Sequence, residues 1–565
     1  MLRTFYNKVS NAHAKMTITA EATIVQVSSH SCKKRRKLIS NVRRKIKPRF
    51  SIIIIRAGCR QTSWFSVEDR LISGIMTEIR FVDTTLRDGQ QSLWAYGMRT
   101  GMIVPVAEHM DNAGFEAIEL GGPVELPKCV RELREDPWER YRLVVARIKK
   151  TPLRVIHGTR SGFAIYPHAI HQLYDRCMAE VGVKQVRISD SWNDPADWQW
   201  RVKQARAAGL EPVINLIYTI SPRHTDEYYA QKTREALKLN VFRVCLKDPG
   251  GILTPQRTRT LARAVLQSAD GTIAELHTHC TTGLGSLCCL DAIEAGMTSI
   301  NTAIPPLADG SSNPSIFNVA RNAKAMGYKP IINEEPIGAV ANHFLSIAKR
   351  ENLTIGRPPE YDYAQYVHQI PGGMISNLRH QLRLVGMENK LEQTLDEAAQ
   401  VRAEFGYPIM VTPLSQFVGS QAAINVIVGE RYKEVTDQTI EYALGVWGKE
   451  GGALMDAGIK DKILSRGRAG EIARRELPQA SLAELRRKFG GSGVSDEEVL
   501  LRFFTSKEDV ENMRAAGPAR LYSNGGKPLL SLLEELTKRT NRTSIFVQRG
   551  DLSLRLQRKS AIDPR

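Results

Sequence analysis

The sequence predicts an α/β protein: a (β/α)8 barrel of the TIM type, followed by a mainly helical domain and a small C-terminal tail. From Met76 onward, eight short β-branched runs alternate with amphipathic stretches of about a dozen residues, the pattern of repeated βα units. No Gly-x-Gly-x-x-Gly opens the first unit, which disfavours an open dinucleotide-binding sheet. No apolar run approaches the roughly 18 residues that a membrane span needs.

The apolar pattern also places the individual elements. The candidate strands are Ile79–Thr85, Glu116–Gly121, Leu153–Gly158, Gln185–Asp190, Pro212–Thr219, Val241–Lys247, Glu275–Cys280 and Ser299–Ile304. The helices expected between them include Val104–Ala113, Trp138–Ile148, Ala169–Val181, Trp198–Ala208, Tyr228–Leu239 and Pro255–Ser268. Later helices are expected at Ile337–Asn352, Asn377–Met387, Lys390–Glu404 and Thr436–Trp447, with Ser495 as a helix N-cap. The tail offers a helix, Leu529–Arg539, and a hairpin of Thr543–Val547 with Leu552–Leu556.

Charge and patterning divide the chain into four parts. Residues 1–75 are a leader with 16 Lys and Arg against three acids, so they carry 13 of the net charge of +19. The barrel occupies 76–335, the helical domain 336–516 and the α/β tail 517–565. The leader is a targeting segment, a nucleic-acid-binding arm or an upstream extension of the reading frame; the abrupt start of orderly patterning at Met76 favours the extension. The rest of the chain is not basic enough to indicate a nucleic-acid partner.

Catalytic residues of such barrels lie at the C-terminal ends of the strands, and the predicted strands end in many ionisable groups. These groups are Arg87, Asp88, Glu119, His157, Asp190, Tyr218, Lys247, Asp248, His277 and His279. We therefore expect the active site at this end of the barrel.

A metal site is predicted among these residues. His277 and His279 are two apart on one strand, so both imidazoles lie on the same face, and two imidazoles suit a divalent metal. Asp88 is the best placed oxygen ligand. Without the two histidines, we would interpret it as an ordinary turn carboxylate. Lys247 ends an apolar strand, where a bare ammonium is costly. It is a snorkelling or ion-paired lysine, with Asp248 the obvious partner, or it is carboxylated by carbon dioxide into an anionic ligand.

Several motifs then resemble one family. The segment Phe81–Ser92 is similar to the opening of the carboxyltransferase domains of pyruvate carboxylase, oxaloacetate decarboxylase α subunit and transcarboxylase, within the HMG-CoA-lyase-like superfamily. Matching motifs follow in family order over roughly residues 76–516, at Glu135–Arg140, Leu246–Gly251, Leu276–His279, Pro371–Gly373 and Val411–Gln416. The resemblance implies that the helical domain forms a funnel over the barrel mouth.

The resemblance also implies a reaction, the transfer of a carboxyl group between carboxybiotin and a keto acid such as pyruvate or oxaloacetate. It implies zinc or manganese as the metal, and the implied ligands are Asp88, His277, His279 and carboxylated Lys247. The implied catalytic groups are Arg87 and Gln91 on the enolate oxygen, Ser311 as the proton carrier, and Lys247. The implied substrate and biotin pocket comprises Glu119, which orients Arg87, together with His157, Asp190 and Tyr218. This arrangement is physically reasonable, because a metal and an arginine would place positive charge beside the negative charge that develops on the enolate.

Three departures from the family's pattern follow. His157 stands where the family has an arginine that contacts the substrate, with Arg160 a candidate replacement, which puts pyruvate or oxaloacetate as substrate in doubt. Cys280 follows His279 where related proteins usually carry Asp or Asn, and it is either a packing residue or a metal ligand. Ile220 and Ser221 replace a Gly-Asp pair after the fifth strand, which alters that wall of the pocket. Ser311 matches the position where pyruvate carboxylases have threonine.

The partners follow from what the sequence lacks. We expect biotin on a separate carrier protein or subunit, with biotin carboxylase or decarboxylase subunits as further partners, because no Met-Lys-Met biotinylation motif or ATP-grasp-like half is evident. A homo-oligomer is expected. The eight cysteines form no C-x-x-C pair, which is typical of free thiols in the cytoplasm.

Two other functions remain open. One is a biotin-independent lyase or synthase of the HMG-CoA lyase and isopropylmalate synthase group, which shares Leu-Arg-Asp-Gly and His-x-His but uses no carboxylated lysine. The other is an inactive barrel that serves as an assembly subunit.

Overall fold

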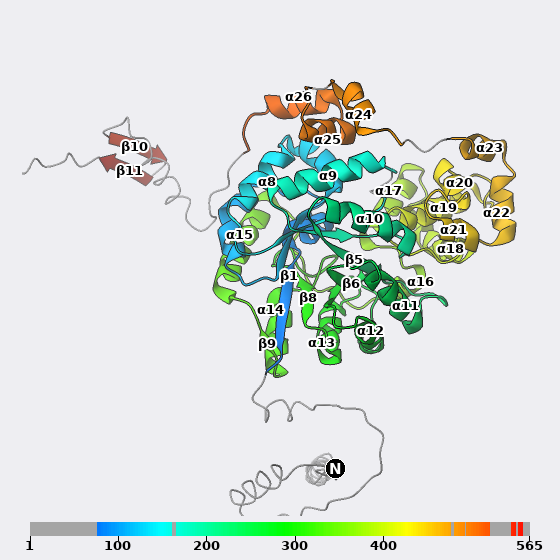
Figure 1. Cartoon of the computed structure of the whole chain (residues 1–565), viewed down its shortest axis with the longest axis horizontal. Helices are drawn as coiled ribbons and strands as arrows, with labels where there is room; N and C mark the ends of the chain where they lie inside the picture. The colour runs from blue at the N-terminus through cyan, green and yellow to red at the C-terminus, as the bar shows by residue number, and fades with distance from the viewer. Residues whose placement is uncertain are drawn as a thin grey trace, which may run out of the picture. The chain divides into compact units, whose positions relative to one another are not determined.

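The computed structural model describes residues 76–160, 165–475, 479–491, 493–519, 544–549 and 552–557. All eight predicted strands form, and they close into a parallel barrel with helices around it (Figure 1). The strands are β1 (Glu78–Asp83), β2 (Ala117–Gly121), β3 (Leu153–Ile156), β4 (Gln185–Ile188), β5 (Glu211–Ile217), β6 (Arg243–Asp248), β7 (Ala274–Thr278) and β8 (Ser299–Thr302). They are hydrogen-bonded in chain order, and β1 closes the ring by pairing with both β8 and β2. The predicted (β/α)8 TIM barrel is confirmed.

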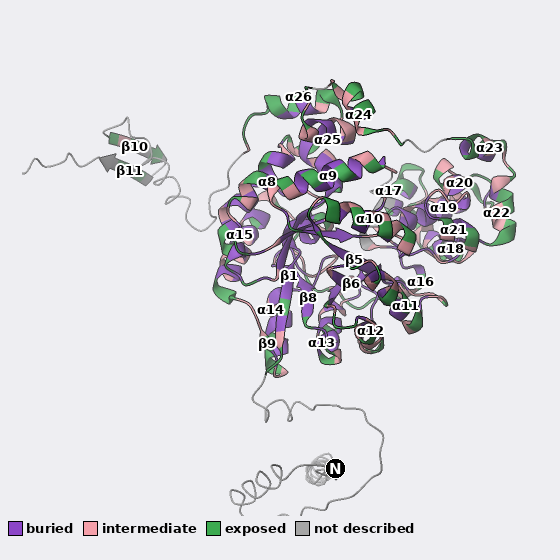
Figure 2. Ribbon diagram, in the orientation of Figure 1, coloured by how far each residue is buried: buried purple, intermediate pink, exposed green. Residues whose placement is uncertain are grey.

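The strands are buried on both faces, as their β-branched sequences require (Figure 2). Facing residues of neighbouring strands share a side of the sheet, so Ile217 of β5 stands beside Lys247 of β6, and Lys247 beside His277 of β7. This register places the charged strand ends at one level of the barrel.

Helices follow the strands as expected for βα units. The barrel helices are α8 (Pro137–Val145), α9 (His168–Val181), α10 (Pro195–Ala207), α11 (Asp226–Leu237), α12 (Pro255–Ser268), α13 (Gly285–Ala295) and α14 (Ile316–Ala325). The first unit differs from the prediction of one helix over Val104–Ala113. It is α5 (Thr100–Ile103), a 3-10 turn around Pro105 and α6 (Ala107–Asp111), because proline has no N–H to continue the α-helical ladder.

A two-residue strand, β9 (Lys329–Pro330), pairs with β1 and was not predicted. The helical region then begins with α15 (Glu334–Glu351), α16 (Ala364–His368), α17 (Gly372–Leu384), α18 (Leu391–Glu404) and α19 (Leu414–Val428). It continues with α20 (Asp437–Ala443), α21 (Lys449–Leu454), α22 (Ala457–Leu464) and α23 (Gly467–Ala473). The four helices predicted in this region are confirmed in substance, with ends shifted by a few residues. None of the described helices is both long and apolar enough to cross a membrane.

Three further helices, α24 (Leu482–Phe489), α25 (Asp496–Phe504) and α26 (Lys507–Ala515), contact the barrel. Ser495 caps α25, as predicted, by accepting the amide of Glu498 at 3.2 Å. The predicted hairpin is confirmed as β10 (Ser544–Arg549) antiparallel to β11 (Leu552–Gln557). The leader 1–75 and the predicted helix Leu529–Arg539 lie outside the described residues.

Two apolar cores form, one around the barrel and one in the helical region. Trp192, which follows β4, belongs to the second core and donates its indole N–H to the Trp447 carbonyl oxygen at 3.0 Å. Gly448 and Gly451 lie against this indole, and a Cβ on either would approach it within 2.3 Å. These two glycines therefore make room for the anchor between barrel and helical region.

Replacing Gly448 with alanine tests this anchor. Its φ is +141°, and the added Cβ would lie 2.2 Å from Cδ1 of Trp192. We expect Gly448→Ala to lower the free energy of unfolding by about 2–4 kcal/mol, measured by urea denaturation. Gly467→Ala is the control, because nothing lies within 4 Å of its added Cβ. Equal effects of the two substitutions would refute the anchor.

Candidate functional site

The predicted metal ligands meet at the C-terminal end of the barrel. Asp88 lies in the π-helical turn Thr85–Gly89 after β1, and His277 and His279 lie at the end of β7. One oxygen, Oδ2 of Asp88, is 3.0 Å from Nε2 of His277 and 3.2 Å from Nε2 of His279. All three side chains are buried, and their donor atoms lie within 4.8 Å of one another. They are the one group of this kind among the described residues.

Hydrogen bonding on the far side of each ring suits this cluster to a cation. Nδ1 of His279 lies 2.7 Å from the Ser311 carbonyl oxygen, which can only accept, so Nδ1 carries a hydrogen and donates to it, while Nε2 faces Asp88. Nε2 of His277 is buried and meets Asp88 without hydrogen-bond geometry. Burial lowers the pKa of His277 to about 3, so this ring is neutral. Two imidazole nitrogens facing one carboxylate oxygen fit a divalent metal.

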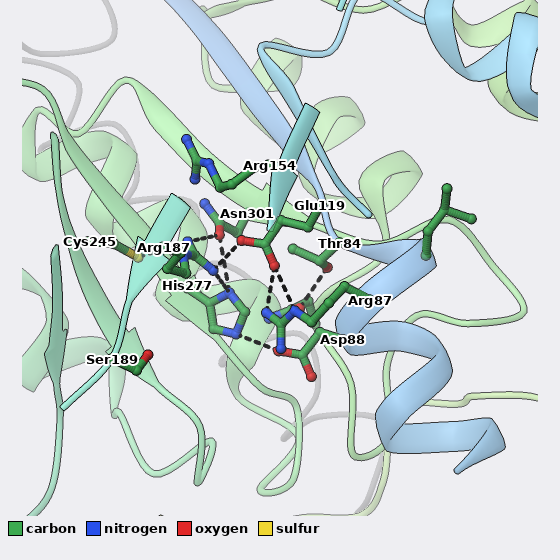
Figure 3. A network of polar contacts seen from close by, with 12 residues as sticks. Thr84, Arg87, Asp88, Glu119, Arg154, Arg187, Ser189, Cys245, His277 and Asn301 are labelled. Atoms are coloured by element: carbon green, nitrogen blue, oxygen red, sulfur yellow. Dashed lines mark hydrogen bonds and ion pairs between the residues drawn. The ribbon is translucent and has the colours of Figure 1, made fainter. Parts of the chain in front are cut away.

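Arg87 lies directly beside this cluster (Figure 3). Its Nη1 is 2.8 Å from Asp88 Oδ2, and its Nε and Nη2 donate to Oε2 of Glu119 at 2.8 and 2.6 Å. Burial opposes ionisation of both acids. Even so, Arg87 holds the pKa of Asp88 well below its usual range, and Arg187 with Arg87 lowers the pKa of Glu119 to about 2. The guanidinium is therefore fixed between two carboxylates at the barrel mouth.

A column of charged and polar side chains supports the site from inside the barrel, and the sequence reasoning missed it. Arg187 of β4 pairs with Glu119 at 2.6 Å and approaches His277 Nδ1 at 3.1 Å (Figure 3). One layer below, Arg154 forms two hydrogen bonds of 2.8 Å with Glu275. Asn301 of β8 faces His277 Nδ1 at 3.1 Å, where it orients the ring. The available signal was a charged residue in the middle of a short apolar strand.

Lys247 is the penultimate residue of β6 and stands beside His277. It is buried, and no acidic group lies within 4 Å of its ammonium in the described part of the chain. Burial, with Arg87 nearby, lowers the pKa of Lys247 to about 8. The predicted pairing with Asp248 does not form, because that carboxylate accepts the amides of Ile252 and Leu253 and the Thr278 hydroxyl.

Gln91 and Ser311 lie near the same end of the barrel. Gln91 is an exposed residue of α4 (Gln90–Trp94), the short helix that continues the turn bearing Arg87 and Asp88. Ser311 follows β8, and its hydroxyl donates to the Ser92 carbonyl oxygen at 3.0 Å. Its own carbonyl fixes His279. Ser311 is thus tied to the metal-type cluster through its backbone.

The side chain of His157 lies outside the barrel interior, so the expectation that it lines the substrate pocket is wrong. Arg154 points inward to Glu275, and the alternation of strand side chains turns His157 outward toward α9 and α10. There its Nδ1 is 2.7 Å from Asp175, and its Nε2 is 2.8 Å from His171. Arg201 of α10 completes this buried group.

Asp190 and Tyr218 also lie away from the metal-type cluster. The Asp190 carboxylate accepts from Thr159 and from the amides of Trp192 and Asp194, and it pairs with Arg160 at 3.0 Å. Burial raises its pKa to about 6. Tyr218 lines a pocket of about 640 Å³ between the loops after β5 and β6. Neither Arg87 nor the metal-type cluster lines that pocket.

Two family models match the chain. Residues 78–343 match the model described as HMGL-like, and residues 366–514 match the conserved carboxylase domain. The first match covers the barrel, and the second covers most of the helical region.

Named relatives match over most of the chain. A pyruvate carboxylase subunit of Methanothermobacter thermautotrophicus is 33% identical over 75% of both chains, and its counterpart in Methanocaldococcus jannaschii is 36% identical over 66% of both. The 2-oxoglutarate carboxylase large subunit of Hydrogenobacter thermophilus is 30% identical over 76% of this chain and 67% of that one. The chain thus spans about two thirds to three quarters of these relatives, but 31% of the pyruvate carboxylase of Bacillus subtilis, to which it is 26% identical.

A solved structure agrees in fold. The carboxyl transferase domain of Rhizobium etli pyruvate carboxylase, determined with pyruvate, superposes with a TM-score of 0.71 at 23% identity and 78% coverage of both chains. Together with the sequence relatives, this likeness establishes that the chain belongs to the family of biotin-dependent carboxyltransferases that includes these pyruvate carboxylase subunits.

Proposed function

We propose that this protein transfers a carboxyl group between biotin on a separate carrier and a keto acid of the pyruvate or oxaloacetate type. The observation that carries the proposal is the contact between Arg87 and the Asp88–His277–His279 cluster, with Nη1 of Arg87 2.8 Å from Asp88. With a divalent metal held by the cluster, the metal and Arg87 would concentrate positive charge where an enolate would form, which is the group that the family's chemistry must stabilise.

Asp88, His277 and His279 would hold the metal, and zinc and manganese both accept this donor set. A bound divalent metal supplies Lewis-acid stabilisation of an oxyanion. Lys247 would supply a fourth ligand once its amine has added to carbon dioxide, a reaction that forms a C–N bond and releases a proton. Its burial beside His277, without an acidic partner within 4 Å, supports this role.

Arg87 and Gln91 bind the oxygen of the keto acid, and Glu119 keeps the guanidinium in place. In the carboxylating direction, the biotin ring nitrogen loses its carboxyl group and takes up the proton of the Ser311 hydroxyl. The Ser311 oxygen in turn accepts a proton from the carbon next to the keto group of the acid. The enolate carbon then forms the new C–C bond with the released carbon dioxide. Asp190 and Tyr218 belong to the biotin side of the mouth in this proposal.

The expected partners are a biotin carboxyl carrier protein or subunit and the carboxylase or decarboxylase subunits that load or unload it. Relatives of this chain are themselves named as subunits of carboxylases, which supports a multi-subunit enzyme. A homo-oligomer and a cytoplasmic location complete the proposal, and the six described cysteines, all free thiols, are consistent with that compartment.

Removing one metal ligand tests the metal site. We expect His279→Ala to lose the bound metal, measured by elemental analysis, and to lower carboxyl transfer at least about 100-fold, because one of the three described donors disappears. Cys280→Ala is the control, since this buried neighbour lies outside the cluster and faces Asp309. Full metal content in both Asp88→Ala and His279→Ala would eliminate this site.

The proton carrier is tested at Ser311. Ser311→Ala should lower kcat by about 10²–10⁴-fold and Ser311→Thr should keep most of it, because only the hydroxyl is needed. Metal content should stay constant, since His279 is held by the backbone carbonyl. Ser312→Ala is the matched control, because that buried hydroxyl has no hydrogen-bond partner in the described structure. If Ser311→Ala turns over normally, the proton takes another route.

The location of biotin is tested with avidin. The purified chain should not bind streptavidin, and transfer should appear only when a biotinylated carrier or free biotin is added. Avidin should then abolish transfer by sequestering the ring, as measured by oxaloacetate decarboxylation. Full decarboxylation in biotin-free, avidin-treated samples would instead support a lyase.

A further inference from the structure

Seven arginine side chains are buried in the described part of the chain. Six pair with a carboxylate: Arg87, Arg140, Arg154, Arg187, Arg201 and Arg243. Arg402 of α18 is the exception. It is 4% exposed, and no described carboxylate lies within 4 Å of it. Burial lowers its pKa to about 10. An unpaired buried cation is costly, so its contacts call for an explanation.

Arg402 directs Nη2 to the backbone and hydroxyl at the end of β5, while its Nε donates to the Pro408 carbonyl oxygen at 3.3 Å and its guanidinium lies over the Tyr407 ring. Its Nη2 donates to the Ile220 carbonyl oxygen at 2.8 Å and to the Thr219 hydroxyl at 3.1 Å. Gln369, just after α16, binds the same two residues. Its Oε1 accepts from the Ile220 amide at 3.2 Å and the Thr219 hydroxyl at 3.1 Å, and its Nε2 donates to the Ile220 carbonyl oxygen at 3.0 Å.

The backbone conformation of Gln369 is a second unfavourable feature at the same contact. Its φ is +51°, a left-handed conformation that residues other than glycine rarely adopt. Both Gln369 and Thr219 are buried, at 5% and 1% exposure. Two residues of the helical region thus adopt unfavourable local states to reach the same two residues of the barrel. We name this contact, formed by Gln369 and Arg402 with Thr219 and Ile220, the β5 clasp.

The β5 clasp lies next to the Lys247 backbone. The amide of Tyr218, one residue before Thr219, donates to the Lys247 carbonyl oxygen at 2.6 Å, and Ile217 is the register partner of Lys247. Beyond this point β5 has no further ladder, and the clasp holds its end together with the Tyr229 hydroxyl, which accepts the Thr219 amide at 3.0 Å. Lys247 is therefore flanked by the end of β5 on one side and by His277 of β7 on the other, so a shift of the β5 end would act on its backbone.

We infer that Gln369 and Arg402 are positioning residues for carboxyl transfer: by clasping the end of β5, they fix Lys247 against the Asp88–His277–His279 cluster. The inference rests on the proposed function for its catalytic consequence, whereas the clasp is measurable without turnover. It gives the helical region a role in the chemistry of the barrel, because residues more than a hundred positions away in the sequence hold the strand.

The test uses the full chain with its metal and biotinylated carrier. Arg402→Gln should raise hydrogen exchange at the amides of Tyr218 and Ile220 at least about tenfold, and lower kcat by about 10- to 100-fold with KM for the keto acid changed less than about threefold. Gln369→Met, which removes the three hydrogen bonds at similar size, should do the same if Arg402→Gln does not fold.

The control is Arg431→Gln. Arg431 also steadies α18, through Glu397 and Glu404 at 2.7–2.8 Å, but it pairs with no barrel residue. It should leave both exchange at β5 and kcat unchanged. Faster exchange at β5 with a normal kcat would overturn the positioning role, and unchanged exchange would overturn the clasp itself. Absence of transfer by the unmodified chain would instead count against the proposed function.

Discussion

The site depends on burying charge inside a closed sheet. Glu119 lies between Arg87 and Arg187, and Glu275 lies between Arg154 and Arg187, all within the barrel. Arg243 also lies 3.5 Å from Glu275. Each carboxylate is stabilised because at least two cations face it, and removal of one of them would leave its charge poorly compensated in a low-dielectric interior. These ion pairs hold Arg87 and His277 in place, so no loop has to become ordered to position them. The mouth of the barrel is therefore preorganised.

Much of this architecture was readable from the chain. All eight strands were predicted, because β-branched runs alternate with amphipathic segments, and strand ends such as Lys247 and His277 identified the reactive end of the barrel. The His277–His279 pair and Asp88 were found because the period of two places both rings on one face. Local pattern suffices where the ligands sit at the ends of strands.

The errors arose where the outcome depended on more than one element. His157 was expected in the pocket by alignment of motifs, but the alternation that turns Arg154 inward turns His157 toward Asp175 on α9. The pairing of Lys247 with Asp248 failed because that carboxylate caps the following turn. The partners of Arg402 lie in a separate region of the chain, and no periodicity in either segment indicates them.

The sharing of one oxygen has a thermodynamic consequence. Oδ2 of Asp88 is 2.8 Å from Arg87 and within 3.2 Å of both imidazoles, so the arginine and any cation at the cluster draw on the same acceptor. Nε and Nη2 of Arg87 are hydrogen-bonded to Glu119, so Nη1 is the donor that can leave Asp88 and bind another anion. Affinity for an anionic acid and affinity for the cation are consequently linked, and linkage is reciprocal. The affinity for the acid would be underestimated if it were measured without the cation, and the affinity for the cation would be underestimated without the acid.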